Sequence, residues 1–310
     1  MPLIIPDELP AAAVLQRENI FTMKMARALS QDIRPLKILI VNLMPTKIQT
    51  ETQLCRLLAN TPLQVELTLL RMDSHQSQNT DRQHLDAFYK TLAQVESQRF
   101  DGMVLTGAPV ELMPYESVDY WTELKEIFEF SKSNVYSSMY ICWGAQAALY
   151  FFYGIEKRRC AEKVFGVFEH RVTDPYDPLV RGFDDVFYAP HSRYTFIDRS
   201  DVLAQPGLRI LAESDEAGLH IVGGKNWRQT FVFGHMEYDR DTLKFEYLRD
   251  ISKGINIRTP RNYFLADDPE KEILFRWRGH AHLFFSNWLN YCVYQQTPYD
   301  LAKLPYEEAL

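Results

Sequence analysis

Residues 137–152 of the chain read SSMYICWGAQAALYFF and combine three local signals. The run from Met139 to Ile141 is rich in β-forming residues, and the small and apolar residues from Gly144 onward are typical of a buried helix. Cys142 falls on the turn between the two. The sequence therefore predicts a strand, a tight turn and a helix, with a thiol held at the carboxyl end of a sheet.

A cysteine on such a turn would be activated by its surroundings. Backbone N–H groups of the following residues and the helix dipole would face any negative charge that develops there, and both favour thiolate over thiol. The alternative is that Cys142 is an ordinary core residue, because free cysteine is among the most buried residue types. This stretch alone leaves both readings open.

Composition narrows the class of protein. Lys and Arg number 34 against 41 Asp and Glu among 310 residues, a formal net charge of −7, which argues against nucleic acid or an anionic membrane as the main partner. The amino terminus does not have the pattern of a signal peptide, and no apolar run is long enough to span a bilayer. The four cysteines show no CxxC spacing, so we expect no metal or disulfide framework and a cytoplasmic location.

Strand and helix signals alternate over the first half of the chain. This alternation predicts an α/β fold, a doubly wound and mostly parallel sheet flanked by helices. Shorter strands after Gly154 predict appended antiparallel strands, with a hairpin turn at 223–226. We expect residues 1–35 to form an amino-terminal arm that packs on the domain, and 36–310 to form one catalytic domain. The predicted strands are 37–43, 63–70, 102–105, 139–141, 164–172, 186–189, 208–213, 219–223 and 230–234, and the predicted helices are 46–58, 80–92, 115–131, 144–152, 241–254 and 279–294.

A second decisive stretch, residues 231–238, reads FVFGHMEY. Alternate residues of an extended segment point the same way, so Glu237 can lie beside the His235 ring and accept a hydrogen bond from one ring nitrogen. The other nitrogen is then free to act on Cys142. This is the nucleophile, base and orienting carboxylate of covalent catalysis.

The remaining histidines have simpler interpretations. We expect His75 and His84 to be solvated, and His280 and His282 to be packing or surface residues. His191 follows the predicted strand 186–189, where a substrate loop and an ordinary turn are about equally plausible.

The motifs around Cys142 and His235 resemble the Cys-His-Glu triad of the class I glutamine amidotransferase-like fold. Within that superfamily the chain is similar, nearly end to end, to the homoserine O-acyltransferases of methionine biosynthesis. The segments that carry the resemblance are PDELP at 6–10, RPLK at 34–37, NLMP at 42–45, TGAP at 106–109, APHSRY at 189–194 and NWLNY at 287–291.

The resemblance implies a role for several residues. Cys142 would carry the acyl thioester, His235 would be the base, and Glu237 would complete the triad. Lys163, Ser192 and Arg249 fall at the family's substrate-contacting positions, although from sequence alone Lys163 and Arg249 would pass as surface charges.

The same resemblance implies the activity of a homoserine O-acetyltransferase, which moves acetyl from acetyl-CoA to the hydroxyl of L-homoserine. Glu111 would set acyl-CoA specificity, because in that family glutamate at this position goes with acetyl transfer and glycine with succinyl transfer. A carboxylate there would repel the succinyl carboxylate and fill the space that the longer chain needs. We expect no metal and no cofactor besides acetyl-CoA as co-substrate, with a homodimer as an open expectation. The alternatives are succinyl transfer, a glutamine amidotransferase, and a catalytically silent binding protein.

Overall fold

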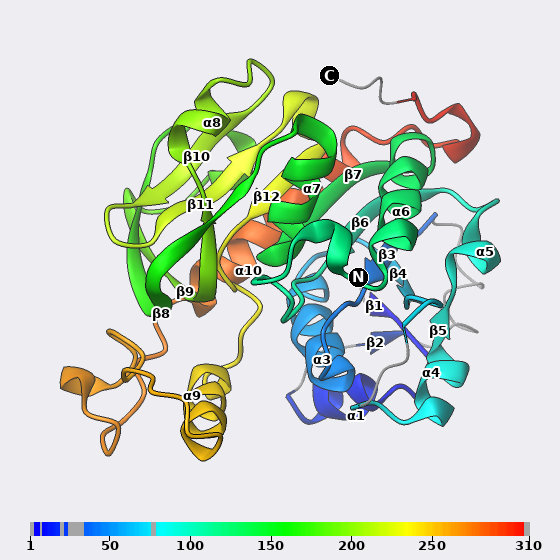
Figure 1. The fold of residues 1–310 in the computed structure, drawn as a ribbon. Helices are drawn as coiled ribbons and strands as arrows, with labels where there is room; N and C mark the ends of the chain where they lie inside the picture. Colours follow the sequence, from blue (N-terminus) through cyan, green and yellow to red (C-terminus); the bar gives the residue numbers. More distant parts are fainter. Residues whose placement is uncertain (1–2, 7, 19–21, 24–33, 76–78, 307–310) are drawn as a thin grey trace.

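The computed structural model describes residues 3–6, 8–18, 22–23, 34–75 and 79–306 (Figure 1). Its strands form one sheet in the order β2-β1-β4-β3-β6-β7-β12-β11-β10-β8-β9, with β5 paired to β4. The strands are β1 (Leu3–Ile4), β2 (Thr22–Met23), β3 (Leu36–Val41), β4 (Val65–Leu70), β5 (Tyr89–Lys90), β6 (Phe100–Leu105), β7 (Val135–Ile141), β8 (Lys157–Val172), β9 (Val186–Ile197), β10 (Arg209–Ser214), β11 (Gly218–Gly223) and β12 (Gln229–Val232).

The sheet has two halves, which Figure 1 separates from side to side. From β2 to β12 every neighbouring pair is parallel, whereas the pairs formed by β12, β11, β10, β8 and β9 are antiparallel. Strands such as β3 and β6 are buried on both faces, which explains their continuous apolar sequence. The predicted mostly parallel α/β sheet with appended antiparallel strands is confirmed.

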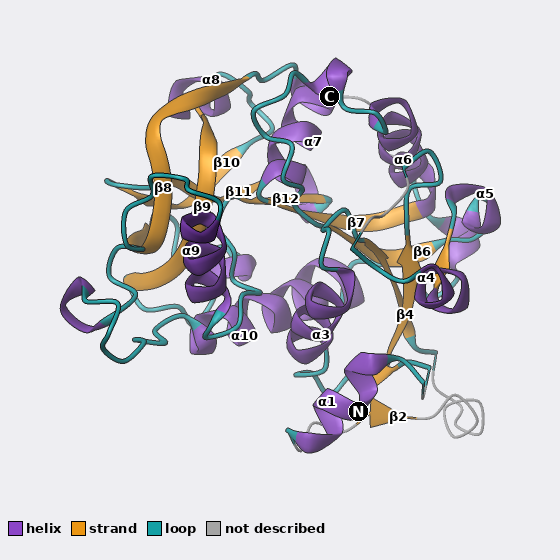
Figure 2. Cartoon of the chain, turned by 60° about the horizontal axis from the view of Figure 1, so that its bottom comes forward, coloured by secondary structure: helices purple, strands orange, loops and turns teal. Residues whose placement is uncertain are grey.

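Helices cover both faces of the parallel half (Figure 2). Leu54 of α3 and Phe284 of α10 pack against Ile38 and Ile40 on one face, while residues of α6 and α7 pack against the neighbouring strand residues Leu39 and Val41 on the other. The helices are α1 (Pro10–Arg17), α3 (Lys47–Leu58), α4 (Arg82–Phe88), α5 (Leu92–Val95), α6 (Trp121–Asn134), α7 (Trp143–Tyr153), α8 (Arg199–Leu203), α9 (Thr242–Ser252) and α10 (Arg278–Asn287), and a π-helical segment, Trp288–Tyr294, follows α10. None of the helices formed by the described residues combines the length and the apolar character needed to cross a membrane.

Several predicted boundaries are wrong. The strand predicted over 164–172 begins at Lys157, and the helix predicted over 115–131 runs from Trp121 to Asn134. The strand predicted to stop at Ala189 continues to Ile197, because β8 pairs with it along most of its length, so His191 and Ser192 lie on a strand and not on a loop. The helix predicted over 80–92 is divided into α4 and α5 by the short strand β5. The division at residue 35 stays a prediction; β1 pairs with β4, α1 packs on α3, and residues 24–33 lie outside the described residues.

Candidate active site

Cys142 occupies a strained turn between β7 and α7. Its φ of 53° and ψ of −116° are unusual for any residue except glycine, and a neighbouring glycine makes the turn possible. A Cβ on Gly144 would lie 2.5 Å from Leu105 Cδ2 and 2.6 Å from the Thr106 carbonyl oxygen. Only glycine therefore lets α7 begin this close to β6, and the predicted strand, turn and helix are present.

His235 comes from the loop that follows β12, which pairs directly with β7. Its backbone N–H donates to the Pro190 carbonyl oxygen at 2.8 Å, and its ring Nδ1 lies 2.6 Å from Glu237 Oε1. All of these groups are buried. The carboxylate fixes the Nδ1–H tautomer and leaves Nε2 to face other partners.

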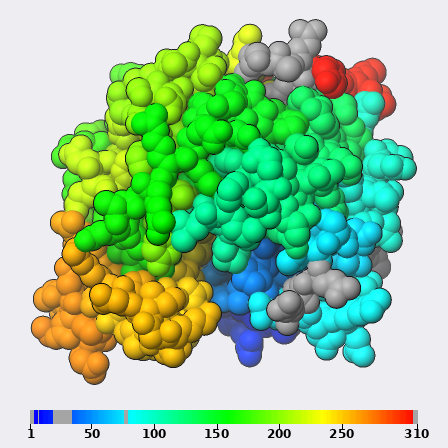
Figure 3. Space-filling view, in the orientation of Figure 1, coloured from blue at the N-terminus to red at the C-terminus, as the bar shows by residue number. Residues whose placement is uncertain are grey.

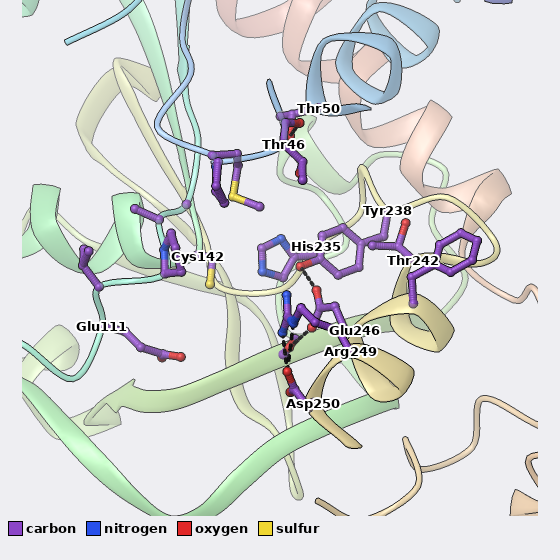
Figure 4. Close-up of a pocket in the computed structure, with 18 of the residues that line it drawn as sticks. Thr46, Thr50, Glu111, Cys142, His235, Tyr238, Thr242, Glu246, Arg249 and Asp250 are labelled. Atoms are coloured by element: carbon purple, nitrogen blue, oxygen red, sulfur yellow. Dashed lines mark hydrogen bonds and ion pairs between the residues drawn. The ribbon is translucent and has the colours of Figure 1, made fainter. Parts of the chain in front are cut away.

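Cys142 and His235 lie beside one another at the carboxyl ends of neighbouring strands (Figure 4). A Cβ on Gly107, just past β6, would lie 3.2 Å from Cys142 Cβ and 3.7 Å from His235 Cε1. Three adjacent parallel strands thus bring a thiol, an imidazole and a close backbone turn together. Trp143 is the first residue of α7, so its N–H has no partner within that helix.

Opposing effects act on the protonation of His235. Burial alone would lower its pKa, but the charges of Cys142 and Glu237 and hydrogen bonds to both side chains outweigh burial and hold the pKa well above its ordinary value. A protonated imidazole beside the sulfur stabilises a thiolate there. The arrangement therefore supports a thiolate–imidazolium pair.

Cys142 and His235 open into a cleft of about 870 Å³. One wall is the start of α3, the second is the segment from Gly107 to Met113, and the third is α9 together with parts of β8 and β9. On the face shown in Figure 3, the residues of α9 lie beside those of α3. A cleft of this size accommodates a small-molecule substrate.

The α9 side of the cleft carries the three predicted substrate residues and two acids. Lys163 Nζ lies 3.1 Å from Asp250 Oδ2 and 3.9 Å from Glu246 Oε2, while Ser192 Oγ donates to Glu246 Oε2 at 2.5 Å. Arg249 Nε donates to Asp250 Oδ1 at 2.9 Å. The Lys163 side chain is only 10% exposed, so it is not the surface charge that sequence alone suggested, whereas Arg249 is 53% exposed.

Sequence reasoning missed Glu246, Asp250 and Tyr238. The Tyr238 ring stacks on the His235 ring with 4.2 Å between centroids, and its hydroxyl donates to Glu246 Oε1 at 2.7 Å. The spacing of Glu246, Arg249 and Asp250, at i, i+3 and i+4, places them on one side of α9 and was a usable signal. Figure 4 shows this side of α9 facing His235.

Glu111 lines the same cleft from the segment that follows β6. Its Oε2 accepts hydrogen bonds from the backbone N–H groups of Tyr194 at 2.8 Å and Thr195 at 3.2 Å, and lies 3.1 Å from Thr195 Oγ1. The carboxylate is therefore fixed by β9 and does not have the freedom of a solvated loop residue.

The other histidines differ in part from expectation. His84 is buried and lies 3.0 Å from Glu51, so the prediction of a solvated residue was wrong, whereas His75 is exposed. His280 and His282 are half-buried packing residues, as predicted.

His191 is fully buried beside His170 and His220, and the ring nitrogens of the three residues are close enough for a metal ion. Their hydrogen bonds do not fit one. His170 Nδ1 lies 2.9 Å from the Phe168 carbonyl oxygen, Arg193 Nε donates to His191 Nδ1 at 3.3 Å, and the Nε2 atoms of His170 and His191 are 3.0 Å apart. The lone pairs of His170 and His191 are already used and a buried guanidinium adjoins them, whereas both ring nitrogens of His220 are buried with no hydrogen-bond partner. We assign no metal to this cluster.

The sheet, together with Cys142 on the strained turn between β7 and α7, defines the class of protein: an α/β protein with the class I glutamine amidotransferase-like fold. A solved glutamine amidotransferase from Thermotoga maritima superposes with a TM-score of 0.53 at 13% identity, covering 84% of this chain and 99% of that chain. This likeness supports the fold alone.

The family model described as homoserine O-succinyltransferase matches residues 2–299, and the chain belongs to that family. It is 60% identical to the homoserine O-acetyltransferase of Clostridium novyi, over 97% of this chain and 99% of that protein. It is 58% identical to the homoserine O-acetyltransferase of Clostridium acetobutylicum, over 97% of this chain and 100% of that protein. The predicted family and fold are confirmed.

Proposed function

We propose that the chain is a homoserine O-acetyltransferase that moves acetyl from acetyl-CoA to the hydroxyl of L-homoserine through a thioester on Cys142. The observation that carries the proposal is the pairing of Cys142 on its strained turn with His235, whose Nδ1 is bound to Glu237 at 2.6 Å. The names of the relatives agree with this activity. The acyl group arrives already activated as a thioester, so the proposal includes no cofactor besides acetyl-CoA.

The first half-reaction acylates the enzyme. Cys142 thiolate attacks the thioester carbonyl, and the oxyanion is stabilised by backbone N–H groups of Trp143 and of the turn at Gly107. As the carbon–sulfur bond to CoA breaks, protonated His235 gives its proton to the leaving CoA thiolate. The products are acetyl-Cys142, CoA and a neutral imidazole.

The second half-reaction uses the neutral His235 as a base. Nε2 takes the proton from the homoserine hydroxyl as its oxygen attacks the acetyl carbonyl, and the bond to Cys142 breaks. O-acetyl-L-homoserine leaves, and the thiolate–imidazolium pair is restored. Glu237 stabilises the positive charge that forms on the ring in each cycle.

The α9 side of the cleft suits a free amino acid. Homoserine carries a carboxylate and an ammonium, and the planar fork of Arg249 can bind the carboxylate through two hydrogen bonds. Glu246 and Asp250 supply the negative charge that an ammonium requires. Lys163 and Ser192, which contact these acids, would hold them in place and complete the substrate pocket.

The placement of Glu111 favours acetyl over succinyl. Its carboxylate lies in the cleft that contains Cys142, where it would repel a second carboxylate and occupy the space of a longer acyl chain. We further propose a cytoplasmic enzyme of methionine biosynthesis. A homodimer stays an open expectation.

The test is intact-mass measurement after exposure of the protein to acetyl-CoA or succinyl-CoA without homoserine, followed by addition of homoserine. We expect an acetyl adduct on wild-type protein and its loss to O-acetyl-L-homoserine, with little succinyl adduct. A stable protein that forms no acetyl adduct would contradict the proposal. So would an adduct that water hydrolyses as fast as homoserine removes it, a result that would instead favour a hydrolase.

A further inference from the structure

The Tyr238 side chain contacts the proposed base on one side and the substrate wall on the other. Its ring stacks on the His235 ring, with 4.2 Å between centroids and 16° between the ring planes, and its hydroxyl donates to Glu246 Oε1 at 2.7 Å. Figure 4 shows Tyr238 beside His235 and its hydrogen bond to Glu246. The phenol oxygen is bonded directly to the ring, so no rotatable bond separates the two contacts. Tyr238 is therefore a rigid spacer between His235 and Glu246.

The backbone of Tyr238 is fixed independently of these two side-chain contacts. Its N–H donates to the His235 carbonyl oxygen at 3.2 Å, and its own carbonyl oxygen accepts from Trp277 Nε1 at 2.9 Å. Trp277 is fully buried and belongs with Tyr238 to one apolar cluster, which also contains Phe165 and Tyr263. The spacer is thus anchored to the core of the protein, and the two side chains that it contacts take their positions from it.

The carboxylate of Glu246 is held by one hydroxyl on each of its two oxygens. Oε1 accepts from Tyr238, and Oε2 accepts from Ser192 Oγ at 2.5 Å, while Lys163 Nζ lies 3.9 Å from Oε2. Each hydroxyl uses only part of the acceptor capacity of a carboxylate oxygen, so an ammonium can still bind there. Without the Tyr238 hydroxyl, the carboxylate would be fixed at one oxygen only.

The Tyr238 hydroxyl is poorly suited to moving protons itself. Burial and the charge of Glu246 hold the pKa of Tyr238 well above its ordinary value, and its proton is already donated to Glu246. A part in the reaction therefore has to act through the placement of His235 and Glu246.

We propose that Tyr238 is a positioning residue that sets the separation between His235 and Glu246, so that the base reaches the hydroxyl of an acceptor whose ammonium is bound by Glu246. The inference rests on the proposed function and deepens it, because it adds a residue that selects the acceptor. Homoserine carries its hydroxyl and its ammonium at fixed places on one short carbon chain. A fixed separation of base and carboxylate therefore favours homoserine over acceptors that lack the amino group.

The test compares two acceptors for the same acetyl-enzyme: homoserine, and 4-hydroxybutyrate, which has the hydroxyl and the carboxylate but no amino group. Tyr238→Phe keeps the stack on His235 and removes the hydroxyl that holds Glu246. We expect the preference for homoserine, measured as the ratio of the two second-order rate constants for loss of acetyl from Cys142, to fall by about 10- to 100-fold, the usual effect of one hydrogen bond to a charged group. A merely structural role would slow both acceptors equally, and an unchanged ratio overturns the proposal.

Two further measurements separate positioning from damage to the site. Acylation of Cys142 by acetyl-CoA does not use Glu246, so its rate and its pH dependence should be unchanged in Tyr238→Phe. Tyr247→Phe is the matched control: it removes a neighbouring hydroxyl on α9, which lies 3.5 Å from Thr259 Oγ1, and should keep the wild-type ratio. If acylation falls as much as transfer to homoserine does, Tyr238 supports the base or the fold alone and the proposal fails.

Variants of Glu246 show whether the hydroxyl acts through this carboxylate. Glu246→Gln should lower the preference for homoserine on its own, a result that does not depend on the folding of any Tyr238 variant, and an unchanged preference overturns the proposal. Adding Tyr238→Phe to Glu246→Gln should then cost less than about twofold more, because the two residues act as one unit. Multiplied losses overturn the link between them.

Failure of the inference is distinguishable from failure of the proposed function. If the Tyr238 and Glu246 variants do not change the preference, but wild-type protein still forms acetyl-Cys142 and O-acetyl-L-homoserine, only the positioning role is overturned. A wild-type protein that forms no acetyl adduct overturns the proposed function, and the positioning role with it.

Discussion

In the parallel half of the sheet, three neighbouring strands, β6, β7 and β12, end side by side, and Gly107, Cys142 and His235 follow their ends. In the antiparallel half, the functional residues lie along the strands themselves: Lys163 on β8, and Ser192, Tyr194 and Thr195 on β9. The first group consists of the atoms that would react. The second binds or orients charged groups and, with α9, forms one wall of the cleft. The difference suggests that the parallel half provides chemistry and the antiparallel half provides selectivity.

The histidines of the two halves also differ, in the direction in which their pKa is shifted. His235, beside a carboxylate and a thiol, has a raised pKa, whereas burial without a carboxylate lowers the pKa of His170 to about 3 and that of His191 and His220 well below its ordinary value. A buried histidine can titrate usefully only where an anion compensates its charge. The cluster in the antiparallel half is therefore structural, although His191 lies one residue from Pro190, whose carbonyl anchors His235.

The largest effect should come from the parallel half. Cys142→Ala and His235→Ala should each lower acetyl transfer by about 10⁴-fold or more, because members of such a triad act as a unit, and the double variant should be little worse. The measurements are kcat/KM and the acetyl adduct by mass. Cys55→Ala, at a buried thiol in α3, is the matched control and should keep full activity. Multiplied losses in the double variant would argue against a shared mechanism.

The orienting carboxylate should have a smaller effect. Glu237→Gln keeps a hydrogen bond to His235 but loses the charge that raises its pKa, so we expect transfer to fall by about 10²- to 10⁴-fold. Because Glu237 raises the pKa of His235, its neutralisation lowers that pKa, and the imidazolium should be lost at lower pH than in wild type. The acylation step should show this as an alkaline limb moved to lower pH. An unmoved limb would indicate that Glu237 does not act through His235.

The antiparallel half should respond to acid through stability. His170 binds a proton in the unfolded chain below about pH 6.5 but not in the folded protein until about pH 3, so stability falls as pH falls, by about 2 kcal/mol at pH 5 for one such residue. Urea unfolding at several pH values should therefore show a shallower acid loss in His170→Gln than in wild type. The same substitution at the exposed His75 is the control. Parallel curves for wild type and His170→Gln would show that His170 does not carry the effect.

The smallest effect concerns the substrate wall. Arg249→Lys keeps the charge but loses the planar fork, so the KM for homoserine should rise about tenfold while acylation of Cys142 by acetyl-CoA proceeds normally. Single-turnover acylation and steady-state transfer separate the two steps. If acylation fails to the same extent as transfer, Arg249 supports the fold or the CoA site, and the division between the two halves is less sharp than proposed.

The sequence predicted the reactive part of the site because local rules govern it. A run of β-forming residues, a cysteine and then small residues allows few structures other than a strand, a tight turn and a helix, and glycine is required at 144 by the closeness of β6. The contact of His235 with Glu237 was predicted from their spacing, but the structure makes it in a turn, where the Tyr238 N–H donates to the His235 carbonyl oxygen at 3.2 Å, and not in the extended chain that we expected.

Only the tertiary structure decided the surroundings of these residues, because they depend on contacts between distant segments. Lys163 and Asp250 are 87 positions apart in the sequence, and Glu111 meets Thr195 across 84 positions, so no local pattern could show that either pair is in contact. The burial of His84 against Glu51 and the extension of β9 through Ser192 are of the same kind. The sequence by itself thus determined the fold and the turn that presents Cys142 near His235 and Glu237. Packing of the antiparallel strands and α9 against that fold determined which charges line the cleft, since burial and pairing of charged groups are properties of the assembled chain.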